Sequence, residues 1–402
     1  MRRALSVDCC PLLGVVLPLS VVCCLYNSML RTYFKELISI SLGHRGMLSD
    51  VPTAAEWEAL LSFAKEQTLV GILYGAIERL PKEQLPPKKV LFHWYKIVGE
   101  LKAENLRLNR ESVELCDYLD GEGFDCVVMK GQAIAQYYPN PLVRTCGDID
   151  VWVVPKGLEK EKGRWIPKSR EYIYKYMQAR GKIEGLNYQH VHLHRFEKTS
   201  VELHITPLSL YNFWYNSRLQ RFFEQEAAAQ FSNFIEMPNG VGKVPALTLE
   251  FNRFFILLHI YSHFLGEGVG LRQLMDYYYV LKQGGSRESK ERTLEIFKRV
   301  GMLRFVAATM WLLQEVFGLE DEYLLCSPNQ KEGEFLLKEV LLSGNFGKYD
   351  SRFDRSRYNE LIPRLWNSLK RKTRLVFRYP HEILFDLPFR TWLYFWRMTL
   401  KR

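Results

Sequence analysis

An apolar strand, a Lys130-Gly131 turn, a short helix and a second apolar strand follow one another in the stretch from Val127 to Val154, VVMKGQAIAQYYPNPLVRTCGDIDVWVV. Asp148 and Asp150 stand at the start of the second strand. Because successive side chains of a strand face opposite ways, both carboxylates point to the same side. Two ionised carboxylates about 4 Å apart repel by roughly 4 kcal/mol at an effective dielectric constant of about 20. The pair therefore requires a shared proton, a cationic side chain or a divalent metal, and acceptor-only oxygens suit Mg2+.

A third carboxylate is expected beside this pair. The segment from His190 to Thr206, HVHLHRFEKTSVELHIT, alternates twice around a polar centre, which predicts a β-hairpin. Glu202 and His204 fall on one face of its second strand, opposite the apolar residues. Three carboxylates from two strands, with a Lys-Gly turn nearby, match two-metal phosphoryl-transfer chemistry. The alternative is that an Asp at the start of a strand is a turn or cap residue.

These residues carry a resemblance. A strand, a glycine turn, a helix, a D-x-D strand and a later acidic strand together resemble the nucleotidyltransferase superfamily typified by DNA polymerase beta. More narrowly, KGQAIAQYYPNPLVRTCGDIDVWV, VELH and HIYSHFLGEGVGLRQLMD are similar to a bacterial family of uncharacterised nucleotidyltransferases. The resemblance implies that Asp148 and Asp150 hold Mg2+ or Mn2+. It also implies that Glu202 joins the metal site and helps to position and activate the acceptor.

The same resemblance implies a set of nucleotide-binding residues, which are Lys130, Gly131, Arg144, Gly147, His204, Arg272 and Asp276. Gln132 follows the turn glycine where the superfamily usually has Ser or Gly. Lys130 and Arg144 are therefore expected to bind the triphosphate, Lys as a point charge and Arg through bidentate contacts. For Arg272 and Asp276, which follow a glycine-rich turn, the alternative is a surface ion pair that stabilises the protein by under about 1 kcal/mol.

The histidines allow a second kind of metal site. His190, His192 and His194 alternate along one strand, which is also a ligand spacing for zinc, or they line the polar face beside Glu202. His259 and His263 share a helix face, four residues apart. Without the glutamate of an H-E-x-x-H motif, these two are expected to pack or to contact substrate.

Periodicity predicts helical regions before and after an α/β core. Together with the resemblance, this implies an α+β protein, with a small mixed nucleotidyltransferase sheet and flanking helices embedded between an N-terminal helical region and a C-terminal helical domain. Lys156 to Arg170 reads as a charged loop, and the chain resumes as a helix from Ser169 to Ala179. The expected segments are a leader (1–28), the N-terminal helical region (29–120), the nucleotidyltransferase α/β core (121–245) and the C-terminal helical domain with a basic aromatic tail (246–402).

The leader and the cysteines bear on location. Arg2-Arg3 and the apolar stretch from Pro11 to Tyr26 form a signal-like segment, or else translation begins at Met29, which is the interpretation favoured here. The eight cysteines show no C-x-x-C pair and no zinc-finger spacing. A disulfide framework is not indicated, so a reducing cytoplasm is predicted.

The chain carries a formal net charge of +10, which suits an acidic partner such as a nucleotide, a nucleic acid or a membrane surface. Basic and aromatic residues concentrate after Asn345, in KRKTRLVFRYP and RTWLYFWRMTLKR. These residues can stack on bases or lie in a membrane interface. Alternatively, their aromatic face packs into the core and their basic face is solvated.

The predicted function is metal-dependent transfer of a nucleoside monophosphate from an NTP, with ATP expected, to a hydroxyl or phosphate acceptor. One alternative is a non-catalytic nucleotide-sensing or scaffold protein on the same fold. Another is a toxin-like nucleotidyltransferase acting on tRNA, which the positive charge favours. The sequence leaves the acceptor open.

Overall fold

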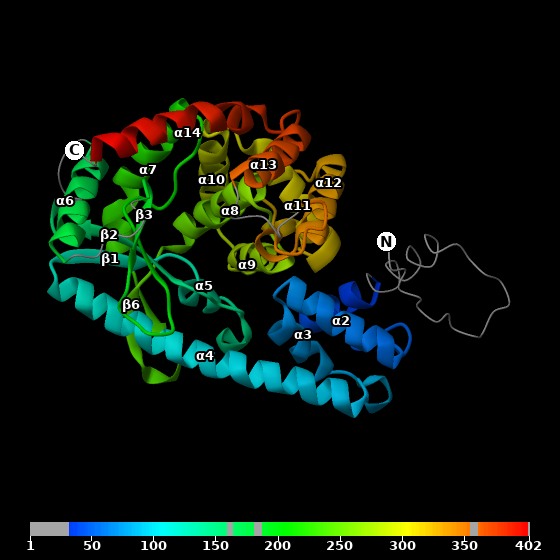
Figure 1. Ribbon diagram of the computed structural model, residues 1–402. Coiled ribbons are helices and arrows are strands. Elements are labelled where there is room, and N and C mark those ends of the chain that lie inside the picture. Colours follow the sequence, from blue (N-terminus) through cyan, green and yellow to red (C-terminus); the bar gives the residue numbers. More distant parts are fainter. Residues whose placement is uncertain (1–31, 159–163, 181–186, 354–360, 401–402) are drawn as a thin grey trace, which may run out of the picture.

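The computed structural model of the protein describes residues 32–158, 164–180, 187–353 and 361–400. A small sheet lies at one end of the molecule and is surrounded by helices, and a further helical region lies at the other end (Figure 1). The predicted α+β class, with a small mixed sheet and flanking helices, is confirmed. The predicted leader, residues 1–28, lies outside the described residues.

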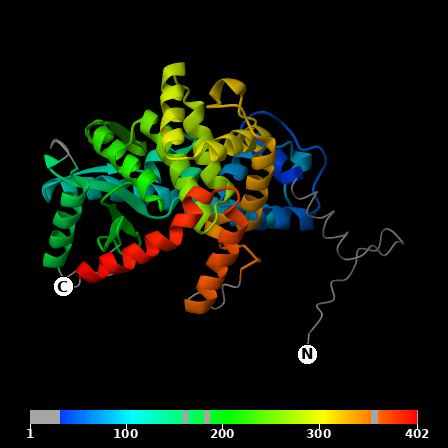
Figure 2. The ribbon, with the colours of Figure 1, turned by 90° about the horizontal axis from the view of Figure 1, so that it is seen from above.

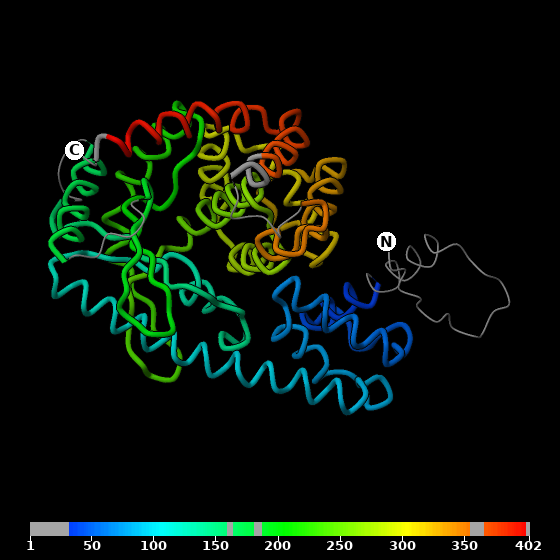
Figure 3. Tube along the Cα trace, viewed as in Figure 1, coloured from blue at the N-terminus to red at the C-terminus, as the bar shows by residue number. Residues whose placement is uncertain are grey.

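The N-terminal region is helical. Its elements are a helix over residues 32–41, α2 (Ala54–Glu66), α3 (Val70–Ile77), the short η1 (Lys82–Gln84) and α4 (Lys88–Gly121). Thr53 begins α2 with a capping box, in which its side chain and that of Glu56 satisfy each other's backbone N–H groups. α4 has 34 residues, which corresponds to a length of about 51 Å. It runs from the N-terminal helices to the sheet and so joins the two parts (Figure 3).

Within the described residues, four strands form one mixed sheet, in the order β1-β2-β4-β3. The strands are β1 (Phe124–Val128), β2 (Ile149–Pro155), β3 (His190–Leu193) and β4 (Val201–His204). β1 and β2 are antiparallel, β2 and β4 are parallel, and β3 and β4 form the predicted antiparallel hairpin. Parallel pairing of β2 with β4 brings the starts of these two strands to the same edge of the sheet.

β2 is buried along its whole length, so both faces of the sheet are covered. On the face that carries Asp150, Trp152 packs against Trp165 and Phe251, with ring centroids 6.2 and 6.3 Å away. These contacts come from the helical segments α6 (Ile166–Ala179), with Trp165 just before it, and α8 (Leu249–Gly266). α8 therefore crosses the face of the sheet that carries Asp150.

Two further features were not predicted from the sequence. They are the helix α7 (Phe213–Phe231) and a two-stranded hairpin of β5 (Phe234–Met237) and β6 (Gly242–Pro245), with the turn η4 (Pro238–Gly240) between its strands. α6 begins at Ile166, three residues before the predicted Ser169, because Pro167 is favourable in the first turn of a helix. Residues 159–163 of the predicted loop lie outside the described residues.

The chain after Leu247 is helical in its described part, as predicted. The remaining elements are α9 (Leu271–Lys282), α10 (Arg287–Arg299), α11 (Leu303–Phe317), η5 (Asp321–Tyr323), α12 (Gln330–Ser343), η6 (Asn345–Gly347), α13 (Leu361–Leu375) and α14 (Pro380–Leu400). None of the helices in the described residues is both long enough and apolar enough to cross a lipid bilayer. The division of the chain at residues 121 and 246 stays a prediction.

Candidate functional site

Three carboxylates converge at the start of the parallel strand pair. Asp150 and Glu202 are directly opposite each other in the register of β2 and β4, so their side chains leave the sheet on one face. Asp148, just before β2, points the same way along the strand. One oxygen from each of the three lies within 4.8 Å of the other two, which matches the geometry expected from the sequence.

The turn between β1 and α5 (Gln132–Ala135) brings Lys130 to these carboxylates. Gly131 has φ of +50° and caps α5, a backbone conformation that favours glycine. Met129 N donates to the Asp150 carbonyl, at 3.0 Å, which holds the turn against β2. Lys130 Nζ then lies 2.9 Å from Asp150 Oδ1.

A second side chain, that of His204, contacts the same carboxylate oxygen. His204 Nε2 lies 2.9 Å from Asp150 Oδ1 and 3.3 Å from Glu202 Oε2, and the imidazole is buried. Burial alone would lower the pKa of His204, but hydrogen bonds to Asp150 and Glu202 outweigh it and raise that pKa. A nitrogen between two carboxylates donates its proton, so His204 Nε2 is a hydrogen-bond donor here.

The three carboxyl groups have unequal proton affinities. For Asp150, burial would raise the pKa, but Lys130 and His204 outweigh burial and lower it. The pKa of Glu202 is lowered in the same way, mainly through its hydrogen bond with His204. Asp148 is exposed as a whole residue, but its carboxyl group is partly shielded from water. This burial raises the pKa of Asp148, and repulsion from Asp150 adds to the shift. Of the three carboxylates, Asp148 is therefore the one whose negative charge is least offset by neighbouring side chains.

His190 joins this group, and His192 lies beside it. His190 Nδ1 lies 3.7 Å from Glu202 Oε2, and burial followed by the charge of His204 lowers the pKa of His190 to about 4. His190, Glu202 and His204 form a second set that can offer metal ligands. His192 is opposite Glu202 in the register of β3 and β4, and His194 is exposed. The set predicted from spacing, with His190, His192 and His194 together, is not the one that converges.

α8 supplies a contact that the sequence did not predict. Its residue Phe251 packs on Trp152, and eight residues later, about 12 Å along the helix, His259 reaches Lys130. His259 Nε2 lies 3.0 Å from Lys130 Nζ and 3.1 Å from His263 Nε2. Burial, with the charge of Lys130 next, lowers the pKa of His259 well below its usual value. The neutral ring can thus accept a hydrogen bond from the Lys130 ammonium group and orient it.

Arg144 and Asp276 form a separate cluster. Arg144 Nε and Nη2 donate to the two oxygens of Asp276, at 2.7 and 2.8 Å, and both side chains are buried. Tyr138 and Arg272 also donate to this carboxylate, at 2.6 and 3.0 Å. Burial would raise the pKa of Asp276, but Arg144 outweighs burial and lowers it. The predicted ion pair of Arg272 with Asp276 is thus present, but its carboxylate is buried.

Two further residues of the turn region have defined places. The side chain of Gln132 is buried, and its Nε2 donates to Asn109 Oδ1 of α4, at 2.6 Å. The departure from the small residue usual in the superfamily is therefore accommodated by α4. Gly147 is exposed, directly before Asp148. The nucleotide-binding roles predicted for Arg144, Gly147, His204, Arg272 and Asp276 stay predictions.

The residues at the start of β2 and β4 fit a divalent ion. When ionised, Asp148, Asp150 and Glu202 carry three negative charges, whereas Lys130 carries one positive charge and His204 adds a second only when it is protonated, so at least one negative charge is in excess. Carboxylate oxygens are the ligands that Mg2+ and Mn2+ prefer. The arrangement can hold a hard cation at the edge of the sheet.

A mixed sheet with a glycine turn after its first strand and acidic residues at the start of the next two inner strands is the arrangement of a nucleotidyltransferase. The chain belongs to the family described as uncharacterised nucleotidyltransferase, which matches residues 53–318, more than half of its length. This membership supports a role in nucleotidyl transfer. No curated protein and no solved structure matches the chain.

Proposed function

We propose that the protein transfers a nucleoside monophosphate from an NTP, with ATP as the expected donor, to a hydroxyl or phosphate acceptor. The proposal rests above all on one observation, the convergence of Asp148, Asp150 and Glu202 within 4.8 Å on one face of the sheet. Lys130 at 2.9 Å from Asp150 supports it, because a triphosphate needs a cationic contact beside the metal site.

In this proposal Asp148 and Asp150 hold the divalent ions, Mg2+ or Mn2+, and Glu202 completes the metal site. A bound divalent ion supplies positive charge opposite the triphosphate and lowers the pKa of the acceptor hydroxyl. Lys130, oriented by His259, binds the triphosphate. Arg144 and Asp276 anchor the loop that precedes Asp148 to α9, because their pair joins that loop to the helix.

The reaction conserves its atoms and charges as an in-line displacement. The acceptor oxygen forms a bond to the α-phosphorus of the NTP, the bond from that phosphorus to the bridging oxygen breaks, and pyrophosphate leaves. The acceptor proton passes to a carboxylate, for which we propose Glu202. Because its contact with His204 lowers the pKa of Glu202, this proton does not remain there and passes on to solvent.

The test is incubation of the protein with NTPs labelled at the α-phosphate, Mg2+ and a cell extract, followed by mass spectrometry of labelled products. We expect label in an acceptor together with release of pyrophosphate, and a loss of about 10²-fold to 10³-fold in Asp150→Asn, the size expected when one preorganised charged group is removed. Glu171→Gln is the matched control, since its ion pair with Lys175 is exposed.

The two alternatives give different results in the same experiment. A scaffold or nucleotide sensor binds NTP without releasing pyrophosphate. A toxin-like enzyme acting on tRNA places the label in the tRNA fraction, and digestion of the extract with ribonuclease beforehand removes the product. Equal turnover in the wild type and in Asp150→Asn would contradict the assignment of the site.

A further inference from the structure

The outward face of α14 is apolar, which is the reverse of what a surface helix normally presents to water. Five side chains on it are between 47% and 73% exposed, namely Leu384, Leu387, Tyr394, Phe395 and Met398. At about 100° per residue they fall within an arc of roughly 100°, so they form one continuous stripe along the helix. We call these five residues the α14 stripe.

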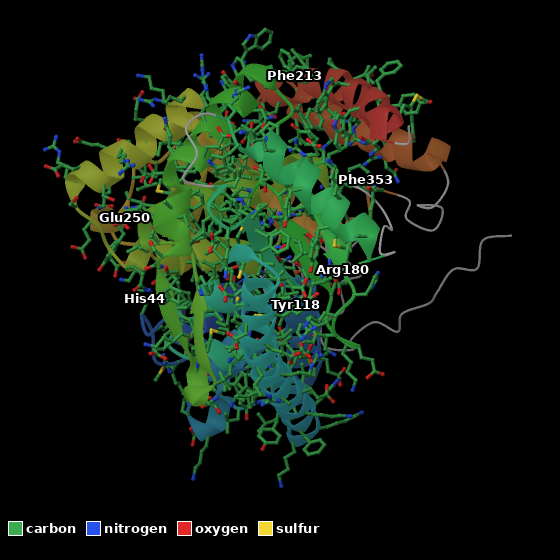
Figure 4. The ribbon with its side chains drawn as sticks, turned by 90° about the vertical axis from the view of Figure 1, so that its left-hand side faces the viewer. His44, Tyr118, Arg180, Phe213, Glu250 and Phe353 are labelled. Atoms are coloured by element: carbon green, nitrogen blue, oxygen red, sulfur yellow. The ribbon has the colours of Figure 1, made fainter. Side chains whose placement is uncertain are left out.

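The opposite face of α14 packs against the rest of the protein. The stripe is therefore a second apolar face of this helix. Phe389 is buried against Tyr211 and Phe213, with ring centroids 5.5 and 6.2 Å away. Glu382 accepts a hydrogen bond from Tyr211 N at 2.7 Å. Trp396 packs on Tyr174 of α6. Figure 4 shows Phe213 beside this helix, and Figure 2 shows α14 running along the outside of the molecule toward α6.

The region around the stripe is strongly basic. Residues 361–400 contain eight Lys and Arg and two acidic residues, a formal charge of +6. Arg371 is buried, and ion pairs with Asp386, Glu339 and Glu332 engage four of the others, which are Lys372, Arg374, Arg378 and Arg390. Both acidic residues, Glu382 and Asp386, are buried, so neither presents negative charge at the surface. Arg390 and Arg397 are exposed and lie along one edge of the stripe by helical spacing. An apolar stripe flanked by arginines fits a surface that is apolar inside and anionic outside.

We propose that the α14 stripe docks on the surface of a lipid bilayer that contains anionic lipids. In this arrangement α14 lies in the plane of the interface, with the stripe at the boundary of headgroups and acyl chains and the basic residues among the headgroups. The exposed Tyr394 and Trp392 suit this boundary, where Tyr and Trp are enriched. The docking does not depend on nucleotidyl transfer.

Two other occupants fit the same surface less well. A nucleic acid would complement the charge, but the aliphatic side chains of Leu384, Leu387 and Met398 offer no ring for base stacking. A second copy of the chain would complement the apolar stripe, but it would bring two regions of charge +6 together. Only the lipid surface complements both properties.

The experiment is co-sedimentation of the full chain with sucrose-loaded vesicles, either of phosphatidylcholine alone or with about a third of phosphatidylglycerol. We expect binding to the anionic vesicles that weakens at high salt, because the basic residues contribute to it. The double variant Leu387→Ser with Phe395→Ser should lower the partition coefficient about tenfold or more, since it removes apolar area from the interface. Both residues are exposed, so the fold should persist, which circular dichroism checks.

Phe92→Ser is the matched control, since Phe92 is an equally exposed aromatic residue on α4, and it should leave vesicle binding unchanged. Asp150→Asn should also leave it unchanged, so a failure of the proposed enzyme activity does not affect this test. Absence of binding to anionic vesicles would overturn the proposal. So would a stripe variant that loses binding to a labelled RNA, or one that dissociates a dimer in ultracentrifugation, while vesicle binding stays the same.

Discussion

Two charged clusters lie within the same part of this molecule, and they differ in the balance of their charges. In the cluster around Asp276, one buried carboxylate meets two guanidinium groups and a tyrosine hydroxyl. In the cluster around Asp150, three carboxylates meet one lysine and one histidine, and Asp148 is exposed. In the Asp276 cluster, the positive charges outnumber the negative charge. In the Asp150 cluster, negative charge is in excess, and Asp148 is at the surface.

We infer from this difference that the Asp276 cluster mainly stabilises the fold and that the Asp150 cluster is available to a cation. A buried carboxylate with bidentate and further donors gains stability from its partners and has little to offer a ligand. Carboxylates that repel one another cost stability, and a protein keeps them where a cation or a reaction requires them. The resemblance implies a metal-binding role for Asp148 and a nucleotide-binding role for Asp276, and these two carboxylates lie in environments with opposite balances of charge.

The largest expected effect tests the first cluster. Asp276→Asn should lower the free energy of unfolding by about 3–5 kcal/mol, because it leaves Arg144 buried without a charged partner. Urea unfolding followed by circular dichroism measures the change. Glu171→Gln, at an exposed ion pair, should leave the same quantity nearly unchanged, because water screens this pair. A loss of similar size in both variants would remove the distinction between the clusters.

The next effect tests the second cluster. Asp148→Asn should leave the metal-free free energy of unfolding unchanged or higher, because it relieves repulsion from Asp150 and Glu202. In the wild type, Mg2+ at a hundred times its Kd should add about 2.7 kcal/mol, and this gain should be lost in the variant. Thermal or urea unfolding with and without Mg2+ measures both quantities. A gain of equal size in Asp148→Asn would place the metal elsewhere.

The smallest effect compares the cations of the two clusters. Lys130→Ala should weaken NTP binding about tenfold to a hundredfold, because one charged contact contributes roughly 1.5 to 3 kcal/mol. Calorimetry at fixed Mg2+ measures the affinity. The partner variant, Arg144→Ala, should mainly destabilise the fold, since its guanidinium group is held by Asp276. Wild-type affinity in Lys130→Ala would show that the nucleotide is bound by other residues.

The side of the sheet that each carboxylate of the acidic cluster faces was predictable, because this is a local property of a strand. Alternation along a strand fixes which side Asp148, Asp150 and Glu202 face, and the hairpin from His190 onward follows from the same period. The Lys-Gly turn precedes α5 directly in sequence, so the place of Lys130 also follows from its neighbours. These features need only the period of a strand and the preference of glycine for a positive φ.

The rest depends on contacts between distant segments, which no local pattern encodes. Arg144 meets Asp276 across 132 positions, and Lys130 meets His259 across 129. Both contacts depend on how α8 and α9 pack over the sheet. The same packing buries the acidic face that the alternation alone leaves open. Gln132 stands where the superfamily usually has a small residue, and its contact with Asn109 of α4 accounts for this departure.

The pairing of β2 with β4 also determines when the site can form during folding. Asp150 and Glu202 are neighbours only because two parallel strands pair across some fifty intervening positions, including all of β3. Contacts between such distant segments form slowly, because the loop between them must first be closed at an entropic cost. We therefore expect the carboxylates to meet late, after the helices have formed. An unfinished chain that lacks β4 lacks Glu202 and cannot assemble this charge cluster, so the site forms only when the sheet is complete.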